Sequence, residues 1–136
     1  MKTETIVAFR VFQEKDMLRR YNNYSKYTVK KYLTDSINTD FWKKVSTALN
    51  VYGFSLTMKT IKVGICDEFS DGVYLPKNKE IILCANTLVN KGAFENALHR
   101  QLIKLYDDVR STNYNFANCK HLACTEIRAA LFSHEC

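Results

Sequence analysis

The sequence is poor in proline and glycine, two residues that are abundant in disordered and low-complexity chains. Its 136 residues include one proline and four glycines, whereas 46% are hydrophobic and 12% are aromatic. Disordered and low-complexity chains have the opposite composition, because they bury too little apolar surface to offset the entropy of ordering. A chain of this length suits one compact domain that buries roughly two-thirds of its unfolded surface. The sequence therefore predicts a globular domain.

Long apolar runs and targeting signals are also lacking. No apolar run approaches the roughly 18 residues that cross a bilayer, so we expect any membrane association to be peripheral or through a partner. The N-terminus has no secretory pattern, and Glu4, Glu14 and Asp16 are unlike a matrix presequence, which is poor in acids. We therefore expect no cleaved targeting segment.

The chain carries an excess of positive charge without a basic cluster. It has 20 basic and 14 acidic residues, a net charge of +6, which favours acidic partners, anionic lipid or nucleic acid. The basic residues stand singly or in pairs, such as Arg19–Arg20, Lys30–Lys31 and Lys43–Lys44, and no nucleic-acid motif accompanies them. We interpret them as solvated charge and expect no nucleic-acid partner.

The N-terminal part contains two predicted helices and one segment without a pattern. Residues 3–20 mix β-branched and helical signals and are predicted to be a helix, whereas the tyrosine-rich residues 21–31 are predicted to be a loop or an extension that packs on a partner. Thr39 or Asp40 can cap the next helix, which Gly53 ends. Its expected core residues are Phe41, Val45, Leu49 and Val51.

A strand and a hairpin are predicted next. Residues 60–66 alternate Ile61, Val63 and Ile65 with smaller or polar residues, which is typical of a half-buried strand. Residues 73–75 and 80–84 then flank Pro76–Lys79, the pattern of a hairpin with a four-residue loop.

The strongest helical pattern runs from Gly92 to Arg110. Arg100, Lys104 and Asp107 share a face that we interpret as solvated surface. The opposite, core-facing stripe consists of Phe94, Leu98, Leu102, Leu105 and Val109.

A last helix is predicted over residues 118–132. Glu126 stands on a different line of this helix, beside Leu122 and Ala129, and a carboxylate on such an apolar surface needs a partner. The expected core face consists of Ala123, Ile127, Ala130 and Leu131.

Three segments together resemble a known family. They are GVYLPKNKEIILCAN (72–86), LIKLYDDVR (102–110) and KHLACTEIRAALFSHEC (120–136), of which HLACTEIRAA is the most specific piece. They are similar to the mitochondrial metallopeptidases that process, and help to assemble, a membrane subunit of ATP synthase. The resemblance covers about the C-terminal half of the chain.

The resemblance implies an α+β, zincin-like single domain. In that fold a short antiparallel or mixed sheet packs on the active-site helix and a C-terminal helix, and N-terminal helices precede them. We expect residues 1–57 to form the N-terminal helical region and residues 58–136 to form the peptidase-related region.

The residues at the family's catalytic positions differ from its motif. Where the family has H-E-L-I-H, the aligned residues here are Arg100, Gln101 and Lys104. A zinc peptidase needs two neutral imidazoles one helical turn apart and a carboxylate as general base, so we expect neither zinc nor hydrolysis. His99 is one residue out of phase, since Ile103 lies four residues further on.

Other groups near the expected site leave alternatives open. His121, His134 and Glu126 could meet His99 in space, although surface or capping roles are the favoured interpretation of such histidines. Glu126 aligns with the family's third zinc ligand, so the resemblance implies an ion pair of Glu126 with Arg100 or Lys104. The alternative is that both cations extend into water.

The five cysteines allow more than one arrangement. They form no C-x-x-C pair, which argues against a zinc finger, and an odd count leaves at least one unpaired within the chain. Because the family resides in the oxidising intermembrane space, we expect a disulfide between the sheet region and the C-terminal region; reduced buried thiols are the alternative. The candidates are Cys66 or Cys84 with Cys119, Cys124 or Cys136.

These observations lead to a functional expectation. We expect a catalytically inactive accessory subunit of a mitochondrial membrane complex, with ATP synthase as the favoured complex, on the intermembrane-space side of the inner membrane. The alternative is an assembly factor that binds an ATP synthase membrane subunit transiently. An active enzyme and a nucleic-acid-binding protein rank below both.

Overall fold

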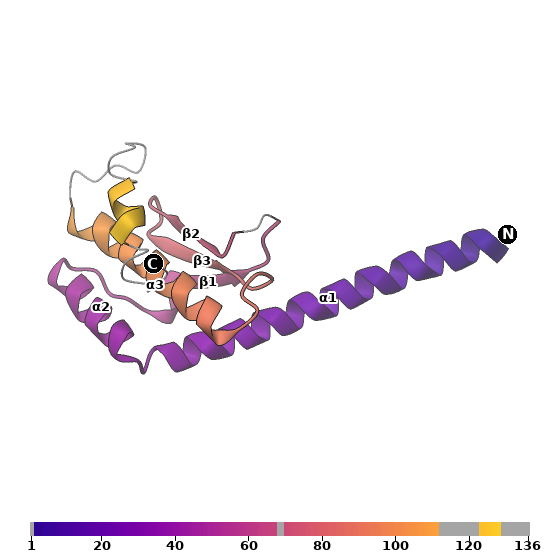
Figure 1. The fold of residues 1–136 in the computed structure, drawn as a ribbon, viewed down its shortest axis with the longest axis horizontal. Helices are drawn as coiled ribbons and strands as arrows, with labels where there is room; N and C mark the ends of the chain where they lie inside the picture. The colour runs from indigo at the N-terminus through magenta and orange to yellow at the C-terminus, as the bar shows by residue number, and fades with distance from the viewer. Residues whose placement is uncertain (1, 68–69, 112–122, 129–136) are drawn as a thin grey trace.

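The protein is a small α+β domain with a long N-terminal helix (Figure 1). The computed structural model describes residues 2–67, 70–111 and 123–128, and for residues 2–15 it describes the backbone. The fold class predicted from the sequence is confirmed. The elements are α1 (Lys2–Ser36), α2 (Asp40–Val51), the short 3-10 helix η1 (Met58–Thr60), β1 (Ile61–Gly64), β2 (Gly72–Leu75), β3 (Glu80–Cys84) and α3 (Lys91–Arg110), with a further helical segment at 123–128.

Helix α1 is one continuous helix of 35 residues, so the loop predicted over residues 21–31 is wrong. No proline or glycine interrupts this stretch, and each added residue of an existing helix gains a hydrogen bond even where its intrinsic propensity is modest. Its last turns bury Val29 and Leu33, while its N-terminal part extends away from the body (Figure 1). No helix within the described residues is long and apolar enough to cross a membrane.

Helix α2 begins and ends where the sequence predicts. The Thr39 hydroxyl accepts a hydrogen bond from the Trp42 amide at 3.4 Å, and Gly53 follows the helix with a φ of 80°, a conformation that favours glycine. Leu49 is buried as expected, and so is Val45. Trp42 is buried as well, whereas Val51 is exposed and Phe41 is only partly buried, so the core face is rotated from the predicted one.

The sheet is mixed, with strand order β1-β3-β2. Strands β2 and β3 form the predicted antiparallel hairpin, and Tyr74 lies opposite Ile81. Strand β1 is shorter than the predicted residues 60–66 and runs parallel to β3, with Gly64 opposite Cys84. The parallel pairing brings the end of β1 beside the end of β3.

This pairing determines the disulfide. Cys66 is bonded to Cys84, with the two Cα atoms 5.5 Å apart, so the expected bridge from either cysteine to the C-terminal region is wrong. The Asn86 side chain donates to the Cys66 carbonyl at 2.8 Å and accepts from its amide at 3.0 Å, which extends the strand pairing. Cys124 is free and exposed, and Cys119 and Cys136 lie outside the described residues.

Helix α3 packs against β2, β3 and α2 and supplies much of the core. The Asn90 side chain caps its first turn by accepting from the Ala93 amide at 2.8 Å. Of the predicted stripe only Val109 is partly exposed, and the buried members are Phe94, Leu98, Leu102 and Leu105.

The segment 123–128 is rotated from the predicted core face. Thr125 is buried, whereas Ala123 and Ile127 are exposed, because the Thr125 hydroxyl donates to the Asp107 carboxylate at 2.9 Å. Ala130 and Leu131, the other predicted core residues, lie outside the described residues. A polar contact with α3, not an apolar one, therefore orients this segment.

Candidate functional site

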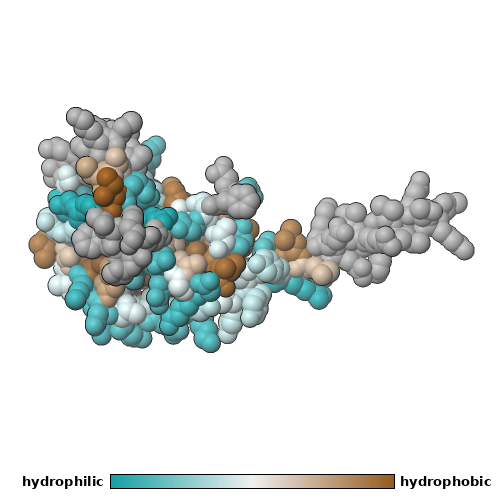
Figure 2. Space-filling view, viewed as in Figure 1, coloured by the Kyte–Doolittle hydropathy of each residue, from teal (hydrophilic) through white to brown (hydrophobic). Residues whose placement is uncertain are grey.

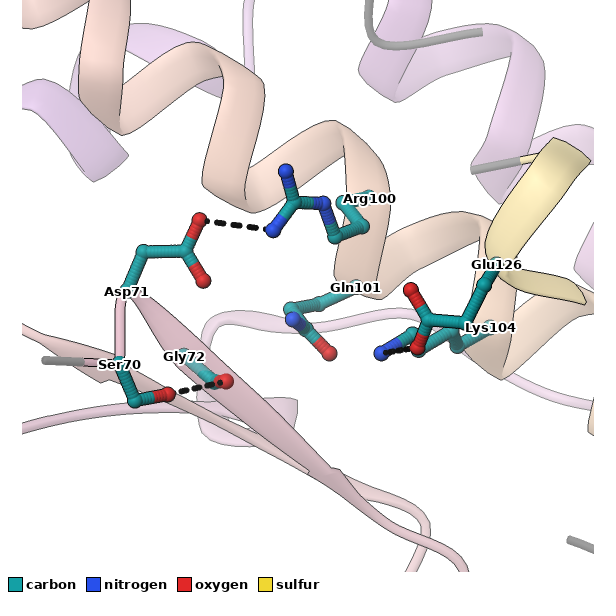
Figure 3. Close-up of a pocket in the computed structure, with 7 residues that line it drawn as sticks. All are labelled: Ser70, Asp71, Gly72, Arg100, Gln101, Lys104 and Glu126. Carbon is teal, nitrogen blue, oxygen red and sulfur yellow. Dashed lines mark hydrogen bonds and ion pairs between the residues drawn. The ribbon is translucent and has the colours of Figure 1, made fainter. Parts of the chain in front are cut away.

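An open pocket of about 710 Å³ lies between helix α3 and the start of strand β2 (Figure 3). Ligand sites in proteins typically have volumes of this order. Helix α3, the strand and the 123–128 segment each contribute to its walls. The lining residues are Ser70, Asp71, Gly72, Arg100, Gln101, Lys104 and Glu126.

A polar cluster fixes α3 against β2 and its hairpin. The Tyr74 hydroxyl donates to the Asp108 carboxylate at 2.5 Å, and Lys79 Nζ lies 2.9 Å from the same oxygen. Burial of the phenol, followed by the hydrogen bond and the negative charge of Asp108, raises the pKa of Tyr74, which keeps its proton for this bond. The distance between helix and strand is thereby set two residues beyond Gly72.

A second polar cluster holds the 123–128 segment on α3. The Asp107 carboxylate is buried and accepts from Thr125, and it also lies 3.1 Å from Arg110 Nε and 3.1 Å from Arg128 Nη1. Two of these partners belong to the segment that carries Glu126. The Asp107 cluster therefore positions Glu126 at the pocket.

Gly72 provides the space for the pocket side of α3. A Cβ atom at this position would lie 2.9 Å from the Ile82 carbonyl oxygen and 3.5 Å from Cγ of Gln101. The first distance is shorter than a Cβ atom tolerates and involves backbone, which cannot easily move. A residue without a side chain is thus required for this close approach.

Both cations of the pocket are paired with carboxylates. Lys104 Nζ contacts Glu126 Oε1, and Arg100 Nη1 lies 3.1 Å from Asp71 Oδ2 (Figure 3). The structure thus brings together Glu126 and one of its two predicted partners. Asp71 was missed in the sequence, because it belongs to a turn whose spacing from α3 no pattern reveals.

Gln101 is the buried member of the pocket. Its side chain points from α3 toward the strand (Figure 3), and the residue is only 1% exposed. Its Oε1 atom finds no hydrogen-bond partner among the described residues. A buried acceptor without a donor costs about 1–3 kcal/mol, so such atoms in folded proteins commonly mark a place where a water or ligand donates.

The one histidine among the described residues, His99, lies away from the pocket. The His99 ring stacks on the Phe41 ring, with a centroid distance of 3.8 Å, on the α2 side of α3. His121 and His134 lie outside the described residues. His99 therefore contributes to the packing of two helices.

The side chains of the pocket do not fit a zinc ion. Zinc is held by neutral imidazoles, thiolates or carboxylates, whereas Arg100 and Lys104 are cations that already pair with the two carboxylates. In the described part of the chain, no group of three His, Cys, Asp or Glu could hold a metal ion.

Comparison with known proteins identifies related sequences. A sequence model of the peptidase M76 family matches residues 24–136. The chain is 38% identical over 92 residues to the mitochondrial inner membrane protease atp23 of Schizosaccharomyces pombe, covering 68% of this chain and 49% of the relative. It is 40% identical over 81 residues to the Candida albicans protease of that name, covering 60% of this chain and 33% of the relative.

A mammalian relative is also similar. Over 72 residues the chain is 35% identical to the mitochondrial inner membrane protease ATP23 homolog of Mus musculus, covering 53% of this chain and 36% of the relative. The chain thus spans half or less of the length of these relatives. No solved structure matches.

These comparisons confirm the resemblance and overturn one expectation drawn from it. The matching family is described as a peptidase family and the relatives are named as proteases, so the expectation of a chain that is not an enzyme, and of an inactive accessory subunit, is contradicted. That expectation rested on three positions of one helix, whereas the family match extends over residues 24–136.

Proposed function

Because this chain belongs to the peptidase M76 family, we propose that it acts on polypeptides at the mitochondrial inner membrane and binds an extended segment of its substrate between α3 and β2. The names of the relatives support the class of substrate and the location. The observation that carries the proposal is the buried Gln101 Oε1 atom, which lacks a donor among the described residues.

The edge of β2 can receive an extended chain. Within the part of the chain that the structure describes, β2 pairs with β3 alone, so its other edge has no strand partner; at the pocket, the Gly72 carbonyl accepts from the Ser70 hydroxyl at 3.0 Å. An extended peptide that adds to such an edge gains main-chain hydrogen bonds whatever its sequence. This mode suits a protein that handles unfolded or membrane-derived segments.

Gln101 supplies an acceptor beside that edge. An amide oxygen is neutral, so it accepts from a peptide N–H at any pH near neutrality without the desolvation cost of a charge. A bound peptide that donates to Oε1 would satisfy the buried acceptor, and this gain is available only on binding. The two ion pairs at the pocket, Arg100 with Asp71 and Lys104 with Glu126, then face the side chains of the peptide.

The substrate and the side of the membrane follow from the resemblance of the C-terminal half. It implies a membrane subunit of ATP synthase as the polypeptide and the intermembrane space as the compartment. Both are part of the proposal, and both can be tested with peptides from that subunit and with protease protection in mitochondria.

The test measures binding and cleavage separately. Fluorescein-labelled peptides that cover the ATP synthase membrane subunits are titrated with the purified chain, and fluorescence anisotropy and mass spectrometry report binding and hydrolysis. Gln101→Met keeps the size of the side chain and removes the acceptor, so we expect peptide affinity to fall about 5–10-fold, as for the loss of one hydrogen bond. The unfolding free energy should not fall, because Oε1 has no partner to lose.

A matched control uses an exposed amide outside the pocket. Asn50→Leu removes an exposed amide from α2 and should leave peptide affinity unchanged. Peptide binding that Gln101→Met does not weaken would refute the assignment of the pocket, and a chain that binds none of the peptides would refute the proposed function.

A further inference from the structure

The described part of helix α1 exposes several large apolar and aromatic side chains to solvent. Figure 1 shows that this helix leaves the body of the domain, and Figure 2 shows hydrophobic and hydrophilic side chains interspersed where it does so. Tyr24 and Tyr27 are 69% and 68% exposed, and Met17 is exposed to a similar extent. Five large side chains of this kind are exposed within three turns, namely Met17, Leu18, Tyr21, Tyr24 and Tyr27.

Three of these residues, Met17, Tyr24 and Tyr27, form a stripe with basic side chains. Positions 17, 20, 24, 27 and 31 are spaced three and four residues apart, which places them along one line of a helix. At 100° per residue this line lies opposite Val29 and Leu33, the residues that α1 buries against the domain. The tyrosine stripe, as we name it, faces away from the domain and consists of Met17, Arg20, Tyr24, Tyr27 and Lys31.

We propose that the tyrosine stripe docks the protein on a membrane surface that contains anionic lipids. The helix would lie in the plane of the headgroups, between the bilayer and the domain. This inference concerns a surface distinct from the pocket and holds whether or not the pocket binds polypeptide. It adds a means of contact with the membrane to the proposed location.

Charge complementarity favours a lipid surface. Residues 16–31 contain five basic residues and one acid, and that acid, Asp16, lies 2.6 Å from Arg19 and 3.1 Å from Arg20. Lys30 and Lys31 are exposed at the other end of the segment. Phosphate headgroups provide the missing negative charge, and Arg20 and Lys31, the two cations on the stripe itself, are the ones that gain affinity beside anionic lipid.

The side chains of the stripe suit a membrane–water interface better than a contact with another helix. In a coiled-coil seam the corresponding positions are aliphatic, and a partner helix would bury Arg20 and Lys31 without their solvent. Tyrosine concentrates at membrane–water interfaces, where its ring contacts the acyl boundary and its hydroxyl contacts water. An arrangement of two tyrosines and a methionine with cations among them fits that environment.

The experiment uses the purified full chain and vesicles of phosphatidylcholine with or without phosphatidylserine. We expect co-sedimentation with the anionic vesicles and little with the neutral ones. Each basic residue near such a surface contributes about fivefold in affinity, so Lys31→Gln should weaken binding about fivefold. Lys77→Gln removes the same charge from the exposed hairpin turn and should change binding by less than about twofold.

A second readout reports on the stripe itself. Trp42 is the only tryptophan and is buried, so a tryptophan introduced by Tyr24→Trp dominates any change in emission on addition of vesicles. We expect a blue shift for this variant and none for Tyr52→Trp, which places the reporter at the exposed end of α2.

Three results would overturn the proposal. They are equal binding to neutral and anionic vesicles, equal losses for Lys31→Gln and Lys77→Gln, and an unshifted emission for Tyr24→Trp. Analytical ultracentrifugation tests the alternative occupant. A wild-type dimer that Tyr24→Ser/Tyr27→Ser makes monomeric, without vesicle binding, would identify the stripe as an interface between copies of this chain.

Discussion

Helix α3 carries two clusters of charged residues that differ in how completely their groups are satisfied. In the Asp107 cluster, a carboxylate with a 2% exposed side chain accepts from Thr125 and pairs with Arg110 and Arg128. In the pocket cluster, two ion pairs are partly open to solvent, and the buried Gln101 acceptor between them has no donor among the described residues. The clusters are less than two helical turns apart.

The difference indicates that the two clusters of α3 have different roles, one in stabilising the fold and the other in binding. A buried carboxylate with three partners contributes to the fold and leaves nothing for a ligand to gain. An unsatisfied acceptor in an open pocket costs stability and is compensated only when something binds. The Asp107 cluster therefore acts by positioning the segment that carries Glu126, and the pocket cluster is the place where binding is expected.

The largest effect is expected from breaking the Asp107 cluster. Asp107→Asn leaves Arg128 and Arg110 without their buried carboxylate, and we expect the free energy of unfolding to fall by about 3–5 kcal/mol. Urea denaturation measures this change. Asp67→Asn removes an exposed carboxylate and serves as the control, with an expected change within about 0.5 kcal/mol. A loss below about 1 kcal/mol for Asp107→Asn would mean that the Asp107 cluster stabilises the fold no more than an exposed ion pair does, and the contrast with the pocket cluster would fail.

The two clusters also differ in how far the sequence predicts them. The pocket face of α3 and Glu126 are predictable, because the i, i+4 spacing and a family resemblance point to them. The sequence pattern predicts a solvated surface at Asp107, and this prediction is wrong, because nothing in a one-dimensional pattern shows that Thr125 and Arg128 cover it. The same limit explains the rotated face of the 123–128 segment, where one hydroxyl–carboxylate bond outweighs an apolar pattern.

The fold divides in a similar way between local and non-local information. Helix α2, the β2–β3 hairpin and α3 were predictable, because caps, turn residues and periodicity are local signals. The parallel partner of β3 was not predictable. The pairing of Cys66 with Cys84 was not predictable either, because it depends on β1 lying beside β3, and strand β2 separates these two strands in the sequence. The continuity of α1 is not predicted, since residues 21–31 are mostly polar or tyrosine and do not show the apolar stripe of a core helix.

The second prediction is that three substitutions convert the pocket into a zinc site. The triple variant Arg100→His/Gln101→Glu/Lys104→His places two imidazoles one turn apart, opposite Glu126, which already contacts the residue at position 104. We expect one zinc ion per chain by elemental analysis. At a zinc concentration of one hundred times Kd, the free energy of unfolding should rise by about 2.7 kcal/mol.

The control for the zinc variant is the same chain with Glu126→Gln added. It should lose most of the bound zinc, because the carboxylate that completes the ligand set with the two imidazoles is removed. Zinc retained by this fourfold variant would mean that Glu126 does not face the metal position, and the proposed geometry of the pocket would be incorrect.

The third prediction concerns the floor of the pocket. Gly72→Ala introduces a Cβ atom 2.9 Å from the Ile82 carbonyl oxygen, so strand β2 must shift relative to β3. We expect a loss of about 1–3 kcal/mol in stability, typical of overpacking, together with weaker peptide binding. Gly64→Ala is the matched control, because its nearest neighbour would be the Ile82 side chain at 3.7 Å, an ordinary contact. Equal losses for both glycines would show that close packing at Gly72 is not specific to the pocket.

The smallest effect is expected for the ion pair of Lys104 with Glu126. The Glu126 side chain is 46% exposed, so water screens the pair and the coupling between the two charges should be below about 1 kcal/mol. A double-mutant cycle of Lys104→Met and Glu126→Gln in urea measures this coupling free of the effect of each residue alone. The coupling should shrink at high salt, because dissolved ions screen the attraction between charges that are exposed to solvent. A salt-independent coupling of about 3 kcal/mol or more would instead make the pair equivalent to a buried one, and the contrast between the two clusters of α3 would no longer hold.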